Sequence, residues 1–261
     1  MSAAPSSRIL AAFGVRERRY LHLIGGGGKT TLMFALAHAL AAEGRNVLTT
    51  TTTRILFPEP GESDRVVLGT DAGPLIERLK IEFETRRHVT AAARHVEAER
   101  KLVGLPVALL DAVLDAAVAN HVLVEADGSA GRSLKAHREH EPVVSARADL
   151  VIAVIGVDCI GAPMDDVHVH RAALLRERLG RPVGTIVTAE DVAGILFHRE
   201  GYLARVERGC EVVAFVNQVT TPAAREDARR LAGALRASDA GNRLARVIVG
   251  DVRTGSFEDA G

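Results

Sequence analysis

The chain of 261 residues is long enough for one large domain or two small ones, and its 47% hydrophobic residues supply a substantial core. Its 33 basic and 33 acidic residues balance to a net charge of zero, which argues against recruitment by nucleic acid or an acidic membrane. Tryptophan is absent and aromatic residues make up 3%, which argues against a surface for stacking bases.

Two cysteines, Cys159 and Cys210, stand far apart without a CxxC pattern, so the sequence predicts neither a disulfide framework nor a zinc site. No apolar run approaches the ~20 residues that cross a bilayer. The N-terminal segment MSAAPSSR lacks the apolar stretch of a secretory signal. We therefore expect a cytoplasmic protein with neither a membrane nor a nucleic acid as partner.

Short β-like runs alternate with longer helical ones, the pattern of an α/β fold with a mostly parallel sheet. The predicted strands are Tyr20–Ile24, Asn46–Thr50, Arg65–Leu68, Val122–Glu125, Val151–Ile155, Val212–Val216 and Arg246–Val249. The predicted helices are Thr30–Glu43, Gly73–Phe83, Pro106–Asn120, Val167–Leu179, Ala189–Phe197 and Pro222–Ala237. Residues 87–102 fit a hairpin or a helix, and the alternation in them favours strands. Residues 244–261 predict a last strand and a loose tail.

The first motif is the run LHLIGGGGKTT at residues 21–31. Glycines tolerate positive φ and close backbone approach, and amide groups in such a loop surround phosphate oxygens at a helix N-terminus. The spacing is the short form GxxGKTT, similar to the ATP loops of Mur-type amide ligases, because Leu23 stands where the strict Walker A pattern has glycine or alanine. A glycine-rich turn is the structural alternative, but the order of strand, loop and helix favours a phosphate site.

The roles in this motif follow from the residue types. Lys29 is expected to reach the β- and γ-phosphates and to act catalytically, and the Thr30 hydroxyl is expected to hold Mg²⁺. ATP is the expected cofactor, with GTP left open. The predicted nucleotide-binding residues of the motif are Gly25, Gly26, Gly27, Gly28, Lys29, Thr30 and Thr31.

Five threonines at residues 49–53 follow the second predicted strand. Open α/β sheets bind ligands beyond the carboxyl ends of their strands, so Thr51 and Thr52 are candidates for contact with a γ-phosphate or a metal-bound water. Threonine also favours strands for its own sake, so the run fits a plain strand tip equally well.

The run VLVEAD at residues 122–127 has the layout of a Walker B strand, which delivers a carboxylate to Mg²⁺. Glu125 is the expected metal ligand beside Thr30. Asp127 is expected to act catalytically by polarising the attacking group, or to hold the metal through water. Two surface acids at a strand end are the structural alternative.

The following loop is basic, with Arg132, Lys135, His137 and Arg138. This charge suits a transferred phosphate or an anionic substrate as well as it suits a solvated loop. His137 and His140 have flanking acids but no third ligand in a recognised pattern, which favours a role other than metal binding.

Six segments resemble, in the same order, the YqeC family, described as accessory proteins of selenium-dependent hydroxylases or selenium cofactor biosynthesis proteins. They are GGGGKTTLMFALA (25–37), VLTTTTTRI (47–55), VEADGSAGRSLKAHREHEPVV (124–144), VIAVIGVDCIGAP (151–163), HVHR (168–171) and FVNQVT (215–220). The resemblance implies a cytoplasmic, nucleotide-binding P-loop protein linked to the maturation of molybdenum- and selenium-containing hydroxylases.

Two residues in these segments are further candidates. FVNQVT stands where GTPases carry the guanine-reading NKxD motif, but Thr220 replaces the aspartate, so the sequence does not support GTP specificity. Asn217 is a candidate for contact with an adenine or with a backbone loop, and a capped turn fits it equally well. Cys159 follows a strand, where a thiol could handle selenium or sulfur, although a lone cysteine is more often a packed residue.

Together these features predict a P-loop NTPase-like three-layer α/β fold with a mostly parallel central sheet. We expect a single domain over residues 1–261, in which residues 130–190 form an elaborated substrate or partner region. The leading function is a Mg²⁺-dependent, ATP-binding accessory protein that acts with a selenium- or molybdenum-dependent hydroxylase or its cofactor machinery. Two alternatives stay open: an ATP-dependent ligase or kinase for a small molecule, and a nucleotide-gated metallochaperone switch.

Overall fold

The computed structural model describes residues 5–261, with side chains from Ser7 onward. Residues 1–4 lie outside the described residues. They begin the N-terminal segment for which the sequence predicts no secretory signal. The chain divides into two compact units, the first made of residues up to 23, 30–128 and 143–150, and the second of 24–29, 129–142 and 151–261. Within the described residues, no helix is both long and apolar enough to cross a membrane.

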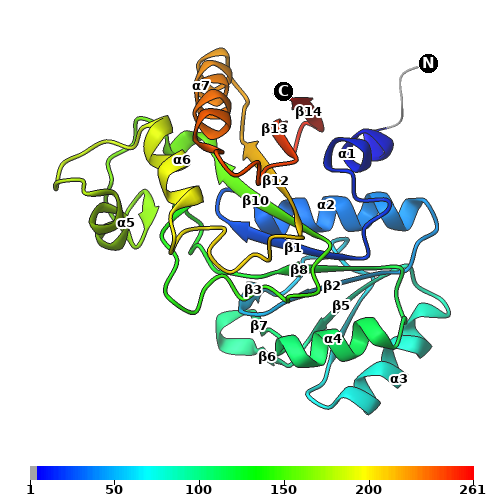
Figure 1. Ribbon diagram of the computed structural model, residues 1–261. Helices are drawn as coiled ribbons and strands as arrows, with labels where there is room; N and C mark the ends of the chain where they lie inside the picture. Colours follow the sequence, from blue (N-terminus) through cyan, green and yellow to red (C-terminus); the bar gives the residue numbers. More distant parts are fainter. Residues whose placement is uncertain (1–4) are drawn as a thin grey trace. The chain divides into compact units, whose positions relative to one another are not determined.

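The first unit is built on a parallel sheet (Figure 1). Its strand order is β1-β8-β2-β5-β4, and the neighbouring strands run parallel. β1, β2, β5 and β8 are buried along their whole length, which explains why they appear in the sequence as continuous apolar or β-branched runs. The strands are β1 (Tyr20–Gly25), β2 (Val47–Thr51), β4 (Arg65–Leu68), β5 (His88–Ala92) and β8 (His121–Glu125).

Helices cover both faces of this sheet. On one face, α3 (Ala72–Phe83) and α4 (Val107–Asp115) pack a hydrophobic cluster against strand residues that include Val89 of β5. On the other face, α2 (Lys29–Ala42) sets the Phe34 and His38 rings against the preceding β5 residue, His88. Successive strand side chains point to opposite faces, so the first unit is a helix–sheet–helix sandwich.

Five shorter elements complete the described part of the first unit. The antiparallel sheet β3-β7-β6 is made of Arg54–Leu56, Lys101–Val103 and Arg94–Val96, with a 3₁₀ turn at Glu97–Glu99. The preference for strands in residues 87–102 is therefore confirmed. The helix α1 (Pro5–Phe13) was not expected from the sequence.

The second unit contains the strand order β10-β12-β13-β14. β12 and β13 are parallel, and β14 pairs antiparallel with β13. The helix α7 packs on β12, β13 and α6 (Figure 1). A separate parallel pair joins β9 to β11. The elements are β9 (Leu134–Lys135), β10 (Leu150–Gly156), a 3₁₀ turn (Val157–Cys159), β11 (Val169–His170), α5 (Ala172–Leu179), α6 (Ala189–Phe197), β12 (Glu211–Asn217), α7 (Pro222–Ser238), β13 (Arg246–Asp251) and β14 (Ser256–Asp259).

The α/β class and the mostly parallel sheet are confirmed, whereas three boundaries were predicted wrongly. The helix expected from Val167 begins at Ala172, because residues 169–170 pair with β9 as strand β11. The helix expected to reach Asn120 ends at Asp115, since Ala117 takes a left-handed φ of 50°. The tail expected to be loose contains β14. The single-domain expectation stays a prediction.

A buried ion cluster holds β9 and β11 of the second unit. The Lys135 side chain is fully buried, and its ammonium lies 3.3 Å from the Glu141 carboxylate, which also accepts two hydrogen bonds from Arg171. Burial alone would raise the pKa of Glu141, but the Arg171 hydrogen bond and the Lys135 charge outweigh it and lower the pKa to about 2.

We expect Glu141→Gln to lower the free energy of unfolding by about 3–5 kcal/mol, because it leaves the Lys135 charge buried without its carboxylate. The matched control is Glu258→Gln, whose partner Arg225 lies 3.6 Å away in an exposed pair, and which should cost less than about 1 kcal/mol. Urea unfolding at pH 7 measures both. An equal loss of unfolding free energy in the two variants would show that the buried cluster stabilises the fold no more than an exposed ion pair does.

The same cluster predicts an acid dependence. The pKa of Glu141 is depressed in the folded state, so its contribution is complete above the ordinary value of 4.5 and is lost as the pH falls towards about 2. The free-energy difference between the natural chain and the double variant Lys135→Met, Glu141→Gln should be constant above about pH 5.5. It should shrink by about 1.4 kcal/mol per pH unit below 4.5, and a difference that stays flat down to pH 3 would refute the ionised pair.

Candidate functional site

The glycine loop connects β1 to α2 and follows a strongly bent path. Gly25, Gly27 and Gly28 have φ angles of 96°, 76° and 116°, which side chains rarely permit. The amide of Gly26 donates to Val154 O at 2.9 Å, and the amide of Gly27 donates to Arg132 O at 3.1 Å. The loop is therefore held by β10 and by the segment after β8.

The lack of room for a Cβ atom, as well as the positive φ angles, requires glycine in this loop. A Cβ on Gly26 would lie 2.3 Å from Arg132 O, and one on Gly27 would lie 2.3 Å from the amide nitrogen of Gly156. Both contacts are to backbone atoms, which cannot rotate away. The packing of the loop thus requires these glycines whether or not a ligand binds.

Lys29 is the first residue of α2 and is 3% exposed. Its ammonium donates to Gly25 O at 2.7 Å, so it lies across the loop that precedes it. An ammonium held at a helix N-terminus presents positive charge where an anion is favoured.

The first unit brings together the two predicted metal ligands. The Thr30 hydroxyl donates to Glu125 Oε2 at 2.6 Å, and Glu125 is the last residue of β8 and only 6% exposed. These residues are far apart in the sequence, and both stand where the sequence motifs place them. A hydroxyl and a carboxylate in contact are hard oxygen donors of the kind Mg²⁺ takes.

Hydroxyls of the threonine run form hydrogen bonds within the first unit. The Thr51 hydroxyl donates to Glu125 O at 2.7 Å, and the Thr52 hydroxyl donates to Val143 O at 3.2 Å. Thr49 bonds His88 Nε2 at 3.0 Å. In this structure Thr51 therefore fixes the backbone of Glu125, a positioning contact that the sequence did not predict.

The remaining predicted residues have distinct surroundings. Asp127 is fully buried. The Asn217 amide donates to Gly27 O at 2.7 Å, and its oxygen accepts from the Val252 amide at 3.1 Å, so its side chain braces the glycine loop. Thr31 follows Thr30 in α2 and is exposed.

The basic loop after β8 does not act as one patch. Lys135 and His137 are buried, with the His137 ring against Tyr202 at 4.7 Å between centroids, while Arg138 and His140 are exposed. Within the described residues, no group of three or more His, Cys, Asp or Glu side chains has the geometry of a metal site.

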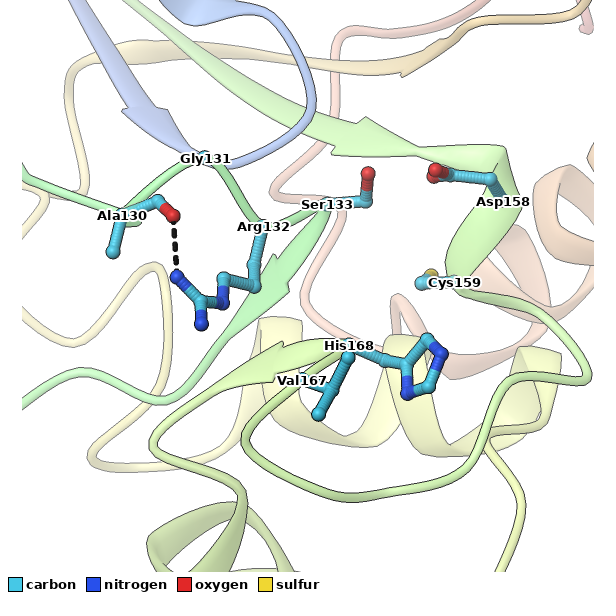
Figure 2. A pocket seen from close by; sticks show the side chains of 8 residues that line it. All are labelled: Ala130, Gly131, Arg132, Ser133, Asp158, Cys159, Val167 and His168. Atoms are coloured by element: carbon cyan, nitrogen blue, oxygen red, sulfur yellow. Dashed lines mark hydrogen bonds between the residues drawn. The ribbon is translucent and has the colours of Figure 1, made fainter.

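The second unit also holds a cavity of about 310 Å³ (Figure 2). It is lined by Ala130–Ser133, by Asp158 and Cys159 after β10, and by Val167 and His168 before β11. Ser133 also approaches the glycine loop, because a Cβ on Gly26 would lie 3.1 Å from its carbonyl carbon. Arg132 and Cys159 were candidates from the sequence, whereas Asp158 and His168 were not, although His168 begins the HVHR segment of the family resemblance.

The fold and this loop define an α/β protein with a parallel sheet and a glycine loop between its first strand and the following helix. A model of the YqeC protein family matches residues 21–173. The uncharacterized protein YqeC of Escherichia coli (strain K12) is 31% identical over 215 residues, which cover 82% of this chain and 81% of that protein. The chain therefore belongs to the YqeC family.

We expect Gly27→Ala to cost about 1–3 kcal/mol more stability than Gly184→Ala, because overpacking adds to the strain of a positive φ. The two glycines have φ angles of 76° and 85°, but a Cβ at Gly184 meets nothing within 4 Å. Urea unfolding of both variants isolates the packing contribution. Equal losses would show that the loop can move away from Gly156.

Proposed function

We propose that the protein is a Mg²⁺-dependent P-loop nucleoside triphosphate-binding protein. The observation that carries this proposal is the hydrogen bond between Thr30 and Glu125, next in the chain to the Lys29 ammonium and the glycine loop. A purely structural turn would require the glycines. It would not require the nearly buried Glu125 carboxylate to accept a hydrogen bond from Thr30, the residue after Lys29.

The residues fit the two groups that the motif implies. The amides at the start of α2 and the Lys29 ammonium would neutralise β- and γ-phosphates. Thr30 and Glu125 would hold Mg²⁺, which takes few protein ligands and keeps several waters. When bound, the cation supplies charge neutralisation at the phosphates. Asp127, beyond the strand end, would orient the attacking group.

ATP is the proposed nucleotide. Thr220 stands where a guanine-reading aspartate would be, and Asn217 is engaged with Gly27 and Val252, which favours neither a guanine nor an adenine contact from this loop. Comparison of ATP, GTP and CTP is therefore part of the test.

Lys29→Ala should raise the dissociation constant for Mg-ATP by about 10–100-fold, the effect of losing a charged hydrogen-bond donor to phosphate. Glu125→Gln should weaken binding when Mg²⁺ is present and match the natural chain when EDTA removes it. Calorimetric titration with ATP, GTP and CTP measures these constants, and Lys80→Ala, an exposed lysine of α3, is the control. Unchanged Mg-ATP binding by Lys29→Ala would overturn the proposal.

The family resemblance supports a biological setting in the maturation of selenium- or molybdenum-dependent hydroxylases. Two modes fit a nucleotide site: a switch, in which hydrolysis changes affinity for a partner, and an enzyme that transforms a small molecule. The cavity beside the glycine loop favours the second, because a switch needs no small-molecule site. This makes an ATP-dependent ligase or kinase the second candidate function.

Nucleotide turnover separates these modes. A switch should hydrolyse ATP slowly alone and faster when a purified hydroxylase is added. An enzyme should form a new product in the presence of its small substrate, with selenide and the molybdenum cofactor as the first additions to assay. A rate that responds to neither the hydroxylase nor these compounds would remove the link to hydroxylase maturation while leaving nucleotide binding intact.

A further inference from the structure

The cavity of the second unit contains two charges of opposite sign that do not neutralise each other. Arg132 donates to two backbone carbonyls, Ala130 O at 2.6 Å and Asp166 O at 3.0 Å, and has no carboxylate partner within the described residues. Asp158 is exposed and, within the same described part of the chain, accepts no hydrogen bond and forms no ion pair. Arg132 and Asp158 therefore form no ion pair within 4.0 Å, although both line the same cavity.

The arrangement of the side chains separates the charges. Figure 2 shows Arg132 on one side of the cavity and Asp158, Cys159 and His168 on the other. The two carbonyls that accept from Arg132 fix the plane of the guanidinium. A guanidinium fixed in this way loses little entropy when it binds a carboxylate in bidentate fashion.

The His168 ring adds a polarised acceptor on the far side. Its Nδ1 lies 2.7 Å from Asp165 Oδ1, and this hydrogen bond lowers the pKa of Asp165. With Nδ1 hydrogen-bonded to the carboxylate, Nε2 is the ring nitrogen left for a ligand. A carboxylate and an imidazole thus line the side of the cavity opposite the Arg132 side chain (Figure 2).

The other features limit the ligand class. Burial raises the pKa of the Cys159 thiol and keeps it neutral, so it contributes a small apolar contact rather than a thiolate. A volume of about 310 Å³ is at the lower end for ligand pockets and suits a small metabolite.

We propose that this cavity binds a free α-amino acid. Its carboxylate binds the Arg132 guanidinium, its ammonium binds Asp158 and His168 Nε2, and its side chain meets Val167 and Cys159. Arg132 O also holds Gly27 of the glycine loop, so the amino acid lies next to the proposed nucleotide site. Its role as the substrate on which the nucleotide acts rests on the proposed function, whereas its binding does not.

The experiment is a thermal-shift screen of the natural chain with each of the twenty common L-amino acids at millimolar concentration. It is run without nucleotide and with Mg²⁺ and a non-hydrolysable ATP analogue. The amino acid with the largest shift is then titrated by calorimetry beside its analogue without the amino group and its analogue without the carboxylate. Each analogue should bind at least about tenfold more weakly, because each leaves one charge of the cavity unmatched.

Two variants assign the contacts. Arg132→Gln should bind the amino acid no better than the analogue without the carboxylate, and Asp158→Asn no better than the analogue without the amino group. Arg199→Gln, at an exposed arginine elsewhere in the second unit, should behave as the natural chain. The natural chain with its analogues already tests the proposal if a variant fails to fold.

The proposal is overturned if no amino acid binds under either condition, or if binding survives both substitutions unchanged. ATP titrations of the same samples keep the two proposals apart. ATP binding without amino acid binding would remove this inference alone, and amino acid binding without ATP binding would remove the proposed function alone.

Discussion

The site depends on a close approach between backbones. The amides of Gly26 and Gly27 bond the carbonyls of Val154 and Arg132, at positions where any Cβ would lie 2.3 Å from a backbone atom. The loop is thereby shaped by the protein before any ligand arrives. A loop whose backbone is already fixed does not spend binding energy on being ordered, which is the physical advantage of such a loop for a phosphate.

Arg132 serves two neighbouring features through different atoms. Its carbonyl bonds the glycine loop, while its guanidinium lines the cavity of the second unit. Asn217 and Gln218 support the same region, Asn217 through Gly27 and Gln218 through Ser133. The loop and the cavity therefore share one wall, and the backbone of residues 132–133 belongs to both.

The sequence was informative where function follows from local order along the chain. Thr30 and Glu125 could be predicted as partners because each stands at a fixed place in a motif, one at a helix start and one at a strand end, and parallel strands end at the same edge. The sheet strands were predictable because strands buried on both faces are continuously apolar. The start of α5 was not, since it depends on residues 169–170 pairing with β9, a contact over more than thirty residues.

The roles of individual side chains were harder to predict, because a hydroxyl or a cation can donate to any of several acceptors that only the fold brings near. Thr51 was a candidate for contact with a γ-phosphate because it stands at a strand end. In the structure its hydroxyl donates to the backbone carbonyl of Glu125. The cavity is assembled from three separate segments, and no periodicity in the sequence indicates that Asp158 and His168 line the same cavity as Arg132. Only the fold brings such residues together.

The basic loop shows how burial sorts charges of the same sign. Lys135 is fully buried, and the carboxylate of Glu141 is committed to it and to Arg171, so that cation stabilises the fold and is closed to a ligand. Arg132, three residues earlier, bonds neutral carbonyls and keeps its full charge. A cation satisfied by carbonyls is held in place without being neutralised, which is the condition for binding an anion from solution. The neutralised Lys135 and the fixed but unneutralised Arg132 therefore divide the loop into a structural part and a part suited to binding.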